Sequence, residues 1–486
     1  MINCFIPFLS LPQARQTVRA LGLCDRIKNI YLLATEKIPD EVEGCEMLMI
    51  DSPASTATFR TIALHADTAY TLLYTKYTAF EPGQFAFERL LAIAGDTNAG
   101  MLYADRYLLK NGNSQQAPVI DYQKGSLRDD FDFGSLLFFR SSVLKQAVRA
   151  MDADYRFAGL YDLRLRVSEL AELVHVNEYL YSEVETDIRK SGEKLFDYVD
   201  PKNRAVQIEM EAVCTAYLKR VGGYLAPDFE PVTFDAGGFE QEASVIIPVR
   251  NRIRTIEDAI RSVLAQKTTF RFNLIIVDNH STDGTSEAIG KYTADGRVVH
   301  LVPERSDLGI GGCWNVGVHH PACGKFAVQL DSDDVYSGPD TLQKIVDAFY
   351  EQNCAMVVGT YRMTDFKMNE IPPGIIDHRE WTLENGRNNA LRINGLGAPR
   401  AFYTPVLRRI NLPNTSYGED YALGLRISRT WRIGRIYDVL YLCRRWEDNS
   451  DAALDVVKMN GHNIYKDRIR TWELQARIAL NAHSPK

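Results

Sequence analysis

Three carboxylates stand within four residues, directly after the apolar run FAVQL. They are Asp331, Asp333 and Asp334. Like charges this close repel one another, and burying them costs free energy unless a cation neutralises them. Aspartate oxygens suit Mg²⁺ or Mn²⁺, and Mg²⁺ is commonly held by one or two carboxylates with substrate phosphates completing its shell. The pattern DSDD therefore favours a divalent-metal site over a turn, whereas the nearby Asp340 fits a helix cap.

A second polar cluster follows another apolar run, in the stretch VDNHSTDGT at 277–285. Asp278 and Asn279 stand where side chains could contact a base or a ribose, and a helix cap is the alternative for Asp278. The residues from Ser281 to Gly284 read as a turn that leads into a helix.

The elements that position these residues alternate between strands and helices. Apolar runs predict strands over 243–249, 272–278, 297–303, 326–331 and 354–363. Amphipathic spacing predicts helices over 255–266, 285–292 and 341–352. Fully apolar strands joined by helices indicate a mostly parallel sheet covered on both faces, in which ligands bind outside the carboxyl ends of the strands. The aspartates are expected at that edge.

The chain also contains an internal repeat. Five segments of the first half match five of the second in the same order: 4–8 with 245–249, 29–36 with 273–280, 72–83 with 329–340, 131–144 with 393–407, and 158–169 with 418–429. This order predicts a tandem duplication of one α/β unit. The Gly- and Pro-containing stretch 222–243 reads as the linker between the halves.

The composition limits the class of protein. The 486 residues exceed one ordinary core, and the net charge of −7 argues against a nucleic-acid partner. The eight cysteines show no C-x-x-C spacing, which indicates free thiols in a reducing compartment. No long apolar run predicts a transmembrane segment, so we expect a cytoplasmic protein, with peripheral attachment to a membrane surface left open.

The second half resembles glycosyltransferase family 2. The resemblance rests on SVIIPVRNR, a helix ending in SVLAQ, IIVDNHSTDGT, FAVQLDSDD and the motif GED at 418–420, in this order over about 245–445. It implies a GT-A fold and inverting transfer of a sugar from a nucleotide donor, with Mn²⁺ or Mg²⁺ as the cofactor. The predicted fold class is therefore α/β, with two tandem GT-A-like domains, each a mostly parallel sheet flanked by helices.

The resemblance assigns roles along the donor site. The loop from Pro248 to Asn251 would lie against the nucleotide, with Arg250 available to a phosphate. Asp278 and Asn279 would meet the nucleoside. Because the family usually has a second acid where Asn279 stands, uridine as the base is left open.

The resemblance also assigns the metal and the base. Asp331 would face the ribose, and Asp333 would bind the metal with Asp334 in support. Asp420 would be the general base with Glu419 beside it, and the alternative for these acids is a stabilising place at a helix N-terminus.

One metal ligand departs from the family pattern. Many members supply a histidine near the stretch LYLCRRWEDNSDA, where this chain has Trp446, Glu447 and Asp448. The third protein ligand of the metal is therefore left open. His378 and His462 are the candidates, and the alternative is that the chain supplies no third ligand.

The first half has lost the acids. Tyr74 to Tyr77 replace DSDD with Lys76 at the metal position, Ala34 and Thr35 replace Asp278 and Asn279, and Gly159 and Leu160 replace Glu419 and Asp420. A lysine at the metal position repels a divalent cation. The domains are therefore predicted as 1–235, a degenerate and non-catalytic copy, 236–450, the catalytic domain, and 451–486, a helical tail.

The sequence is compatible with three hypotheses for the function of the protein. The first is an inverting, metal-dependent glycosyltransferase acting on a glycan or lipid-linked hydroxyl acceptor. The second is a catalytically inactive protein that binds sugar or nucleotide. The third is a nucleotidyltransferase, which the absence of a Gly-rich phosphate loop disfavours. The oligomeric state is open.

Overall fold

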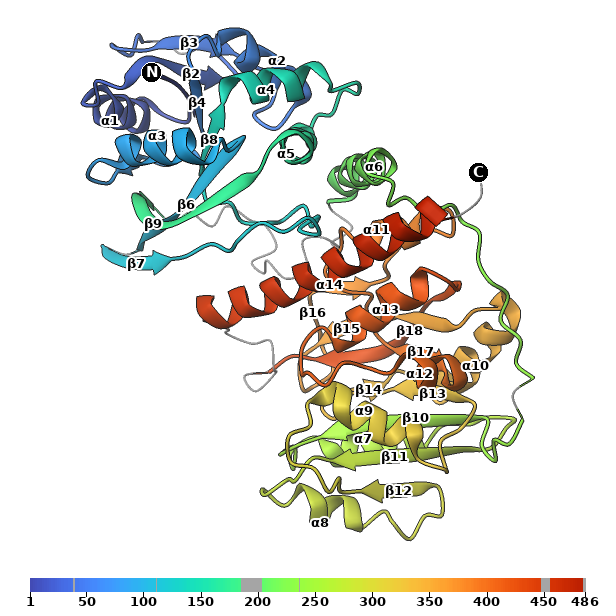
Figure 1. The fold of residues 1–486 in the computed structure, drawn as a ribbon. Coiled ribbons are helices and arrows are strands. Elements are labelled where there is room, and N and C mark those ends of the chain that lie inside the picture. Colours follow the sequence, from blue (N-terminus) through green and yellow to red (C-terminus); the bar gives the residue numbers. More distant parts are fainter. Residues whose placement is uncertain (38–39, 111, 185–202, 236, 447–454, 484–486) are drawn as a thin grey trace. The chain divides into compact units, whose positions relative to one another are not determined.

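The computed structural model describes residues 1–37, 40–110, 112–184, 203–235, 237–446 and 455–483 (Figure 1). The chain divides into two compact units. Unit 1 comprises 1–192, 204–223 and 455–474, and unit 2 comprises 193–203, 224–454 and 475–486. The predicted boundaries at 235/236 and 450/451 touch residues outside the described ranges and stay predictions. In the described part of the chain, none of the helices combines the length and apolar character that a bilayer crossing requires.

Unit 1 is built on one sheet of nine strands. In chain order these are β1 (Ile2–Pro7), β2 (Ile27–Ala34), β3 (Glu46–Met49), β4 (Tyr70–Tyr74), β5 (Phe80–Pro82), β6 (Met101–Lys110), β7 (Asn113–Ala117), β8 (Leu136–Arg140) and β9 (Leu173–Val184). The spatial order is β3-β2-β1-β4-β8-β6-β9-β5, with β7 paired to β6. The first four strands of this order pair in parallel, and the remainder is mixed.

Helices cover both faces of the unit 1 sheet. They are α1 (Leu11–Gly22), α2 (Thr56–His65), α3 (Ala86–Thr97), α4 (Ser141–Arg149), α5 (Gly159–Leu170) and α6 (Arg204–Arg220). Alternation along the strands creates two cores, because successive side chains point to opposite faces. In β1, Cys4 and Ile6 pack with α1 and α3, whereas Phe5 packs with α2, α4 and α5.

Unit 2 repeats this sheet. Its strands are β10 (Ala243–Val249), β11 (Phe272–Asp278), β12 (Val298–Leu301), β13 (Phe326–Gln329), β14 (Val335–Tyr336), β15 (Met356–Thr364), β16 (Glu370–Ile376), β17 (Arg400–Tyr403) and β18 (Ile433–Arg444). The spatial order is β12-β11-β10-β13-β17-β15-β18-β14, with β16 paired to β15. Each strand of unit 1 thus has a counterpart nine places later in the same position.

The remaining helices belong to unit 2, except α14 at the C-terminal end, which is divided between the two units. They are α7 (Ile256–Leu264), α8 (Thr285–Gly290), α9 (Ile310–His319), α10 (Thr341–Gln352), α11 (Gly386–Asn389), α12 (Thr404–Ile410), α13 (Glu419–Ser428) and α14 (Val456–His483). Helix α14 contributes its residues up to Leu474 to unit 1 and those from Gln475 to unit 2. The α/β class with two tandem sheets is confirmed, and every strand predicted from apolar runs in the second half is present.

The register of unit 2 brings the predicted polar residues to one edge. In the parallel pair β10–β11, Val249 lies opposite Asp278, and in the parallel pair β10–β13, Ile246 lies opposite Gln329. The chain leaves all three strands within a few residues of these positions. The side chains of Asp278, Asn279 and Asp331 therefore belong to the carboxyl edge of the sheet, where open α/β sheets bind ligands.

Candidate active site

A cavity of about 220 Å³ lies at this carboxyl edge. Pro248 and Arg250 line it from the end of β10, Asn279 from the end of β11 and Ser332 from the turn after β13. Its other lining residues are Val249, Arg252, Leu308, Ile310, Cys313 and Ser416. Three of the residues predicted to contact a nucleotide thus share one pocket.

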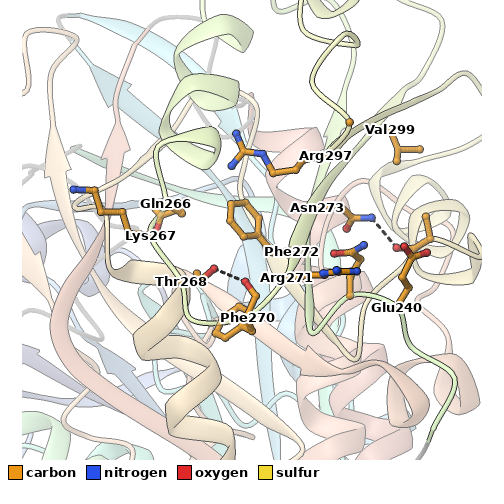
Figure 2. A pocket seen from close by; sticks show the side chains of 13 residues that line it. Glu240, Gln266, Lys267, Thr268, Phe270, Arg271, Phe272, Asn273, Arg297 and Val299 are labelled. Atoms are coloured by element: carbon orange, nitrogen blue, oxygen red, sulfur yellow. Dashed lines mark hydrogen bonds between the residues drawn. The ribbon is translucent and has the colours of Figure 1, made fainter.

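A larger hollow of about 710 Å³ lies at the opposite edge of the same sheet, where the strands begin (Figure 2). Its wall includes Phe272 and Asn273 at the start of β11, and the Thr268 hydroxyl donates to the Phe270 carbonyl across 2.7 Å beside it. Glu240 is the single acidic residue of its lining. We place the candidate active site at the smaller cavity, because the carboxylates that could hold a metal or move a proton gather at that edge.

Asn279 lines the small cavity and carries a buried acceptor. Its backbone N–H donates to Val249 and its Nδ2 donates to the Leu308 carbonyl, each across 2.8 Å. The side chain is 8% exposed, and Oδ1 has no hydrogen-bond partner among the described residues. A buried acceptor without a partner is costly. A donor N–H group of a ligand would satisfy it.

Asp278 is held within its own loop. Its carboxylate accepts from the backbone N–H of Ser281 across 3.0 Å, from the Ser286 hydroxyl, and lies 3.4 Å from His300 Nε2. Burial raises the pKa of Asp278, but these hydrogen bonds outweigh burial and leave the pKa below its usual value. The carboxylate thus stays ionised and fixes the turn. Its role as a ligand contact stays a prediction.

Asn251 likewise shapes the loop after β10. It adopts a positive φ of 53°, and its Oδ1 accepts from the Thr282 N–H across 2.8 Å while its own N–H donates to the Ser281 hydroxyl across 3.0 Å. The two loops that frame the cavity are therefore joined through backbone groups. Arg250 is exposed beside them, where its guanidinium is accessible to a phosphate.

Asp331 and Asp334 both form hydrogen bonds with residues of β18, and Asp331 also with Gln329. Asp331 Oδ1 accepts from Gln329 Nε2 across 2.9 Å, and its backbone N–H donates to the Tyr441 hydroxyl across 3.1 Å. Asp334 Oδ1 accepts from the backbone N–H of Arg444 across 2.7 Å. Burial, followed by the neighbouring aspartate charges, raises the pKa of Asp334 well above its usual value. For Asp331, burial and Asp333 raise the pKa against the lowering effect of Arg400.

Asp333 points toward groups that donate hydrogen bonds. The Trp446 indole Nε1 donates to its Oδ2 across 3.2 Å, and Arg252 Nε lies 3.8 Å from the same oxygen. Arg252 and Arg254 stack over the Trp446 ring at 5.7 and 4.9 Å from its centroid. This cluster was not predicted. Its residues come from the start of α7 and the end of β18, which are distant in sequence, and a tryptophan after a strand has no catalytic signature of its own.

The carboxylates of this site could hold a divalent ion, with few ligands supplied by the protein. Carboxylate oxygens are the ligands that Mg²⁺ and Mn²⁺ prefer, and mutual repulsion among the aspartates is the strain that a cation relieves. The three aspartates do not bring three ligand oxygens within 4.8 Å of one another. In the described parts of the chain, one such group exists, Cys24, Asp25 and Glu88 of unit 1, and it is exposed or half-buried. Phosphate oxygens would have to complete the shell.

The histidines predicted as possible ligands have other surroundings. His378 is 1% exposed, and its Nδ1 lies 2.9 Å from Glu380 Oε1. His462 lies on α14 and belongs to unit 1. Glu447 and Asp448 lie outside the described residues. Trp446 has only an N–H donor and cannot ligate a cation. The residue at this position therefore does not supply the third metal ligand.

Glu419 and Asp420 form the first turn of α13. Gly418 precedes them with a φ of 78°, a conformation that favours glycine. Arg400 Nη1 lies 2.9 Å from Asp420 Oδ2. Burial and the adjacent Asp420 charge raise the pKa of Glu419 to about 8. At neutral pH Glu419 therefore holds its proton, and Asp420 is the carboxylate that pairs with a cation.

The corresponding place in unit 1 is filled by an internal ion pair. Lys76 Nζ lies 2.5 Å from Glu183 Oε1, and Arg106 Nε lies 2.9 Å from the same oxygen. Glu183 is fully buried. Asp162, which lies near the lost base position in sequence, is 2.9 Å from Arg166. Burial raises the pKa of Asp162 despite that partner.

Comparison with known proteins agrees with the arrangement in unit 2. Residues 244–409 match the model of Glycosyl transferase family 2. The family 2 region thus begins at β10 and ends within α12, and it contains DSDD but stops before Glu419 and Asp420. The resemblance stated from the motifs is confirmed over this range.

Curated relatives are also glycosyltransferases. An uncharacterized glycosyltransferase of Rickettsia felis is 30% identical over 200 residues, which cover 40% of this chain and 32% of the relative. Glycosyltransferase GlyG of Streptococcus pneumoniae is 24% identical over 118 residues, which cover 24% of this chain and 38% of the relative. The chain thus spans about a third of the length of these relatives.

Two solved structures that align with part of this chain are glycosyltransferases in complex with nucleotide sugars. S. aureus TarS 1–349 in complex with UDP-GlcNAc aligns with a TM-score of 0.38 and 22% identity, covering 49% of this chain and 72% of that chain. Mannosyltransferase PcManGT from Pyrobaculum calidifontis, in complex with GDP-Man and Mn²⁺, aligns with a TM-score of 0.34 and 17% identity, covering 60% and 88%.

Proposed function

We propose that unit 2 transfers a sugar from a nucleoside-diphosphate sugar to a hydroxyl acceptor, with inversion at the anomeric carbon. One observation carries the proposal. A cluster of carboxylates, Asp331, Glu419 and Asp420, lies around a single arginine, Arg400, whose charge acts on all three. The cluster stands at the carboxyl edge beside the cavity, inside or next to the family 2 region.

The donor would bind with its base in the cavity. Asn279 Oδ1 would accept from an N–H group of the base, and Arg250 would contact a phosphate oxygen. Asp331 would face the ribose. A divalent ion held by Asp333, with Asp334 supporting the loop, would supply positive charge to the diphosphate as it departs. Arg252, which lines the cavity, would add a fixed positive charge there.

Asp420 would act as the general base. The acceptor oxygen attacks the anomeric carbon, its proton passes to Asp420, and the bond from that carbon to the diphosphate oxygen breaks with its electron pair leaving on the diphosphate. Attack from the face opposite the leaving group inverts the configuration. The acceptor would be a glycan or a lipid-linked hydroxyl, and the protein would act in the cytoplasm or at a membrane surface.

Calorimetry tests the donor assignment. The protein would be titrated with UDP, GDP, CDP and dTDP, with and without Mn²⁺, and the titrations repeated with Asp333→Asn. We expect one nucleotide to bind only with Mn²⁺, and Asp333→Asn to abolish that binding without loss of fold, since the change removes a repulsive charge. Metal-dependent binding that survives Asp333→Asn would contradict the metal assignment.

A non-catalytic binding protein is the second candidate. It is favoured by the hydrogen bond from Trp446 to Asp333, because that bond occupies an oxygen which a metal would use. Release of nucleoside diphosphate from a nucleotide sugar separates the two. Turnover supports transfer, whereas tight binding without any release supports the binding protein.

A further inference from the structure

Gln329 joins the donor side of the site to the next strand. In the antiparallel pair β13–β17, Val328 lies opposite Ala401, which brings Gln329 beside Arg400. Gln329 Oε1 accepts from the backbone N–H of Arg400 across 3.2 Å, and its Nε2 donates to Asp331 Oδ1 across 2.9 Å. The side chain is 3% exposed, and both ends of its amide are used. It therefore fixes Asp331 relative to the start of β17.

The Arg400 guanidinium continues the connection to α13. Its Nη1 lies 2.9 Å from Asp420 Oδ2 and donates to the Gly397 carbonyl across 2.6 Å. Burial lowers the pKa of Arg400, but the charges of Asp420, Asp331 and Glu419, together with Tyr441, raise it above its usual value. The guanidinium stays charged and faces the proposed base.

The Gly397 carbonyl is itself held in place. Gly397 has a φ of 83°, and a Cβ there would lie 2.1 Å from His378 Nε2. His378 is fixed in turn by Glu380, 2.9 Å from its Nδ1, and both side chains are buried. A glycine is therefore required at this position, where the buried imidazole packs directly against it. Arg400 thus has one anchor on the loop and one on Asp420.

We propose that Arg400 is the positioning residue of the general base, and that Gln329 couples it to Asp331 so that base and donor are held in one fixed geometry. The inference rests on the proposed function of unit 2. Attack requires the acceptor oxygen, the anomeric carbon and the base to lie in line, and small displacements cost large factors in rate. The chain Asp331–Gln329–Arg400–Asp420 sets that alignment before any acceptor arrives.

Arg400 also determines which acid accepts the proton. Glu419 and Asp420 are adjacent, and the charge of one disfavours ionisation of the other. The contact between Arg400 and Asp420 stabilises the ionised form of Asp420, whereas Glu419 keeps its proton. The acceptor proton therefore passes to Asp420 Oδ1 or Oδ2 rather than being shared between two carboxylates.

The test compares Arg400→Gln, Arg400→Lys and the control Arg426→Gln. Arg426 lies on α13 with Asp420, but its Nη1 donates to Thr430. Release of nucleoside diphosphate from UDP-GlcNAc, GDP-mannose and further nucleotide sugars would be followed with Mn²⁺ and water as the acceptor, from pH 5 to pH 9. Calorimetry with the nucleoside diphosphate would measure binding in the same variants.

We expect Arg400→Gln to lower kcat by about 10- to 100-fold while nucleoside diphosphate affinity stays within about twofold, since positioning acts on the reacting geometry rather than on donor binding. The acid limb of its pH profile should move up by about one pH unit, because an opposite charge has been removed from the base. Arg400→Lys should restore most of the rate, and Arg426→Gln should match the wild type.

Gln329→Met provides a second variant that keeps volume and charge. It should lower kcat without moving the acid limb, because the contact between Arg400 and Asp420 remains. An Arg400→Gln enzyme with unchanged kcat and pH profile would overturn this inference and leave the proposed function standing. A wild type that releases no nucleotide from any donor would overturn both.

Discussion

The indole Nε1 of Trp446 donates a hydrogen bond to Asp333 Oδ2 across 3.2 Å. The ring is held by an edge-on contact with Phe366 at 5.2 Å and by Arg254 over its face at 4.9 Å. A side chain that cannot ligate a cation therefore contacts the aspartate proposed to hold one. On the proposed assignment the indole would compete with the metal for one lone pair, and its hydrogen bond restrains the loop that carries Asp333.

Replacing this indole tests the competition. Trp446→Phe keeps an aromatic ring against Phe366 but removes the N–H donor. Because a net hydrogen bond to a charged group is worth about 1.5–3 kcal/mol, we expect Mn²⁺ affinity to rise by roughly 10- to 150-fold. Calorimetry with Mn²⁺ alone measures it. Trp431→Phe, at a ring that stacks with Arg409, serves as the control, and an unchanged Mn²⁺ affinity in Trp446→Phe would show that the indole does not compete.

Asp420→Asn separates binding from transfer. The amide keeps the size of the side chain but cannot take a proton, so nucleoside diphosphate binding should be unchanged and turnover should fall by about 100-fold or more. Turnover assays beside calorimetry measure both quantities. Asp438→Asn, at an exposed carboxylate 3.1 Å from Lys344, is the matched control. Wild-type turnover in Asp420→Asn would assign the base elsewhere.

Lys76→Met tests the ion pair of unit 1. The substitution leaves the fully buried Glu183 with Arg106 but without its ammonium partner, and we expect a loss of about 1–3 kcal/mol in the free energy of unfolding. Urea denaturation measures the loss. Lys28→Met, which breaks an exposed pair with Asp67, should cost clearly less stability than Lys76→Met. Equal losses in the two variants would mean that burial adds nothing to the Lys76 pair.

His175 predicts a pH dependence of unit 1. Its ring nitrogens lie 2.8 Å from Asp105 and 2.9 Å from Asp121. Burial lowers the pKa of His175, but the two carboxylates outweigh burial and raise it above its usual value. The stabilisation is therefore fully present below the unfolded pKa, near 6.5, and is lost as pH rises through the folded pKa.

Denaturation of the wild type and His175→Gln between pH 5.5 and pH 9 checks this sign. We expect the difference in stability between the two proteins to shrink as pH rises. His319→Gln, at a histidine whose Nε2 lies 2.7 Å from the amide oxygen of Asn411, is the control variant. A difference that grows with pH would reverse the assignment of charge to His175.

The carboxyl-edge residues could be predicted from sequence because each follows an apolar run. Parallel strands end at the same edge of a sheet. The ends of the apolar runs therefore predicted that Asp278, Asn279 and Asp331 lie near one another. The repeat was predictable for the same reason, since both halves keep the positions of their apolar runs although the acids have changed.

The contacts made by Gln329, Trp446 and α14 could not be predicted from the positions of the apolar runs. Gln329 reaches Arg400 through the antiparallel pairing of β13 with β17, which are some seventy residues apart, and no local pattern specifies that register. Trp446 reaches Asp333 from the far end of β18 for the same reason. The predicted tail at 451–486 enters both units through α14, and its buried charged residues gave no sequence signal of a core.

In unit 1 the Lys76 ammonium is the cation that pairs with Glu183. This cation is a side chain and is therefore covalently attached to the protein. An ion held by Asp333 would exchange with solvent and would be removed by a chelator, whereas an ammonium tethered to the backbone does neither. We therefore expect chelation to change the thermal stability of unit 2 without changing the pair of Lys76 with Glu183. On this assignment, Lys76 gives unit 1 a permanent charge at the position where unit 2 would hold a replaceable ion.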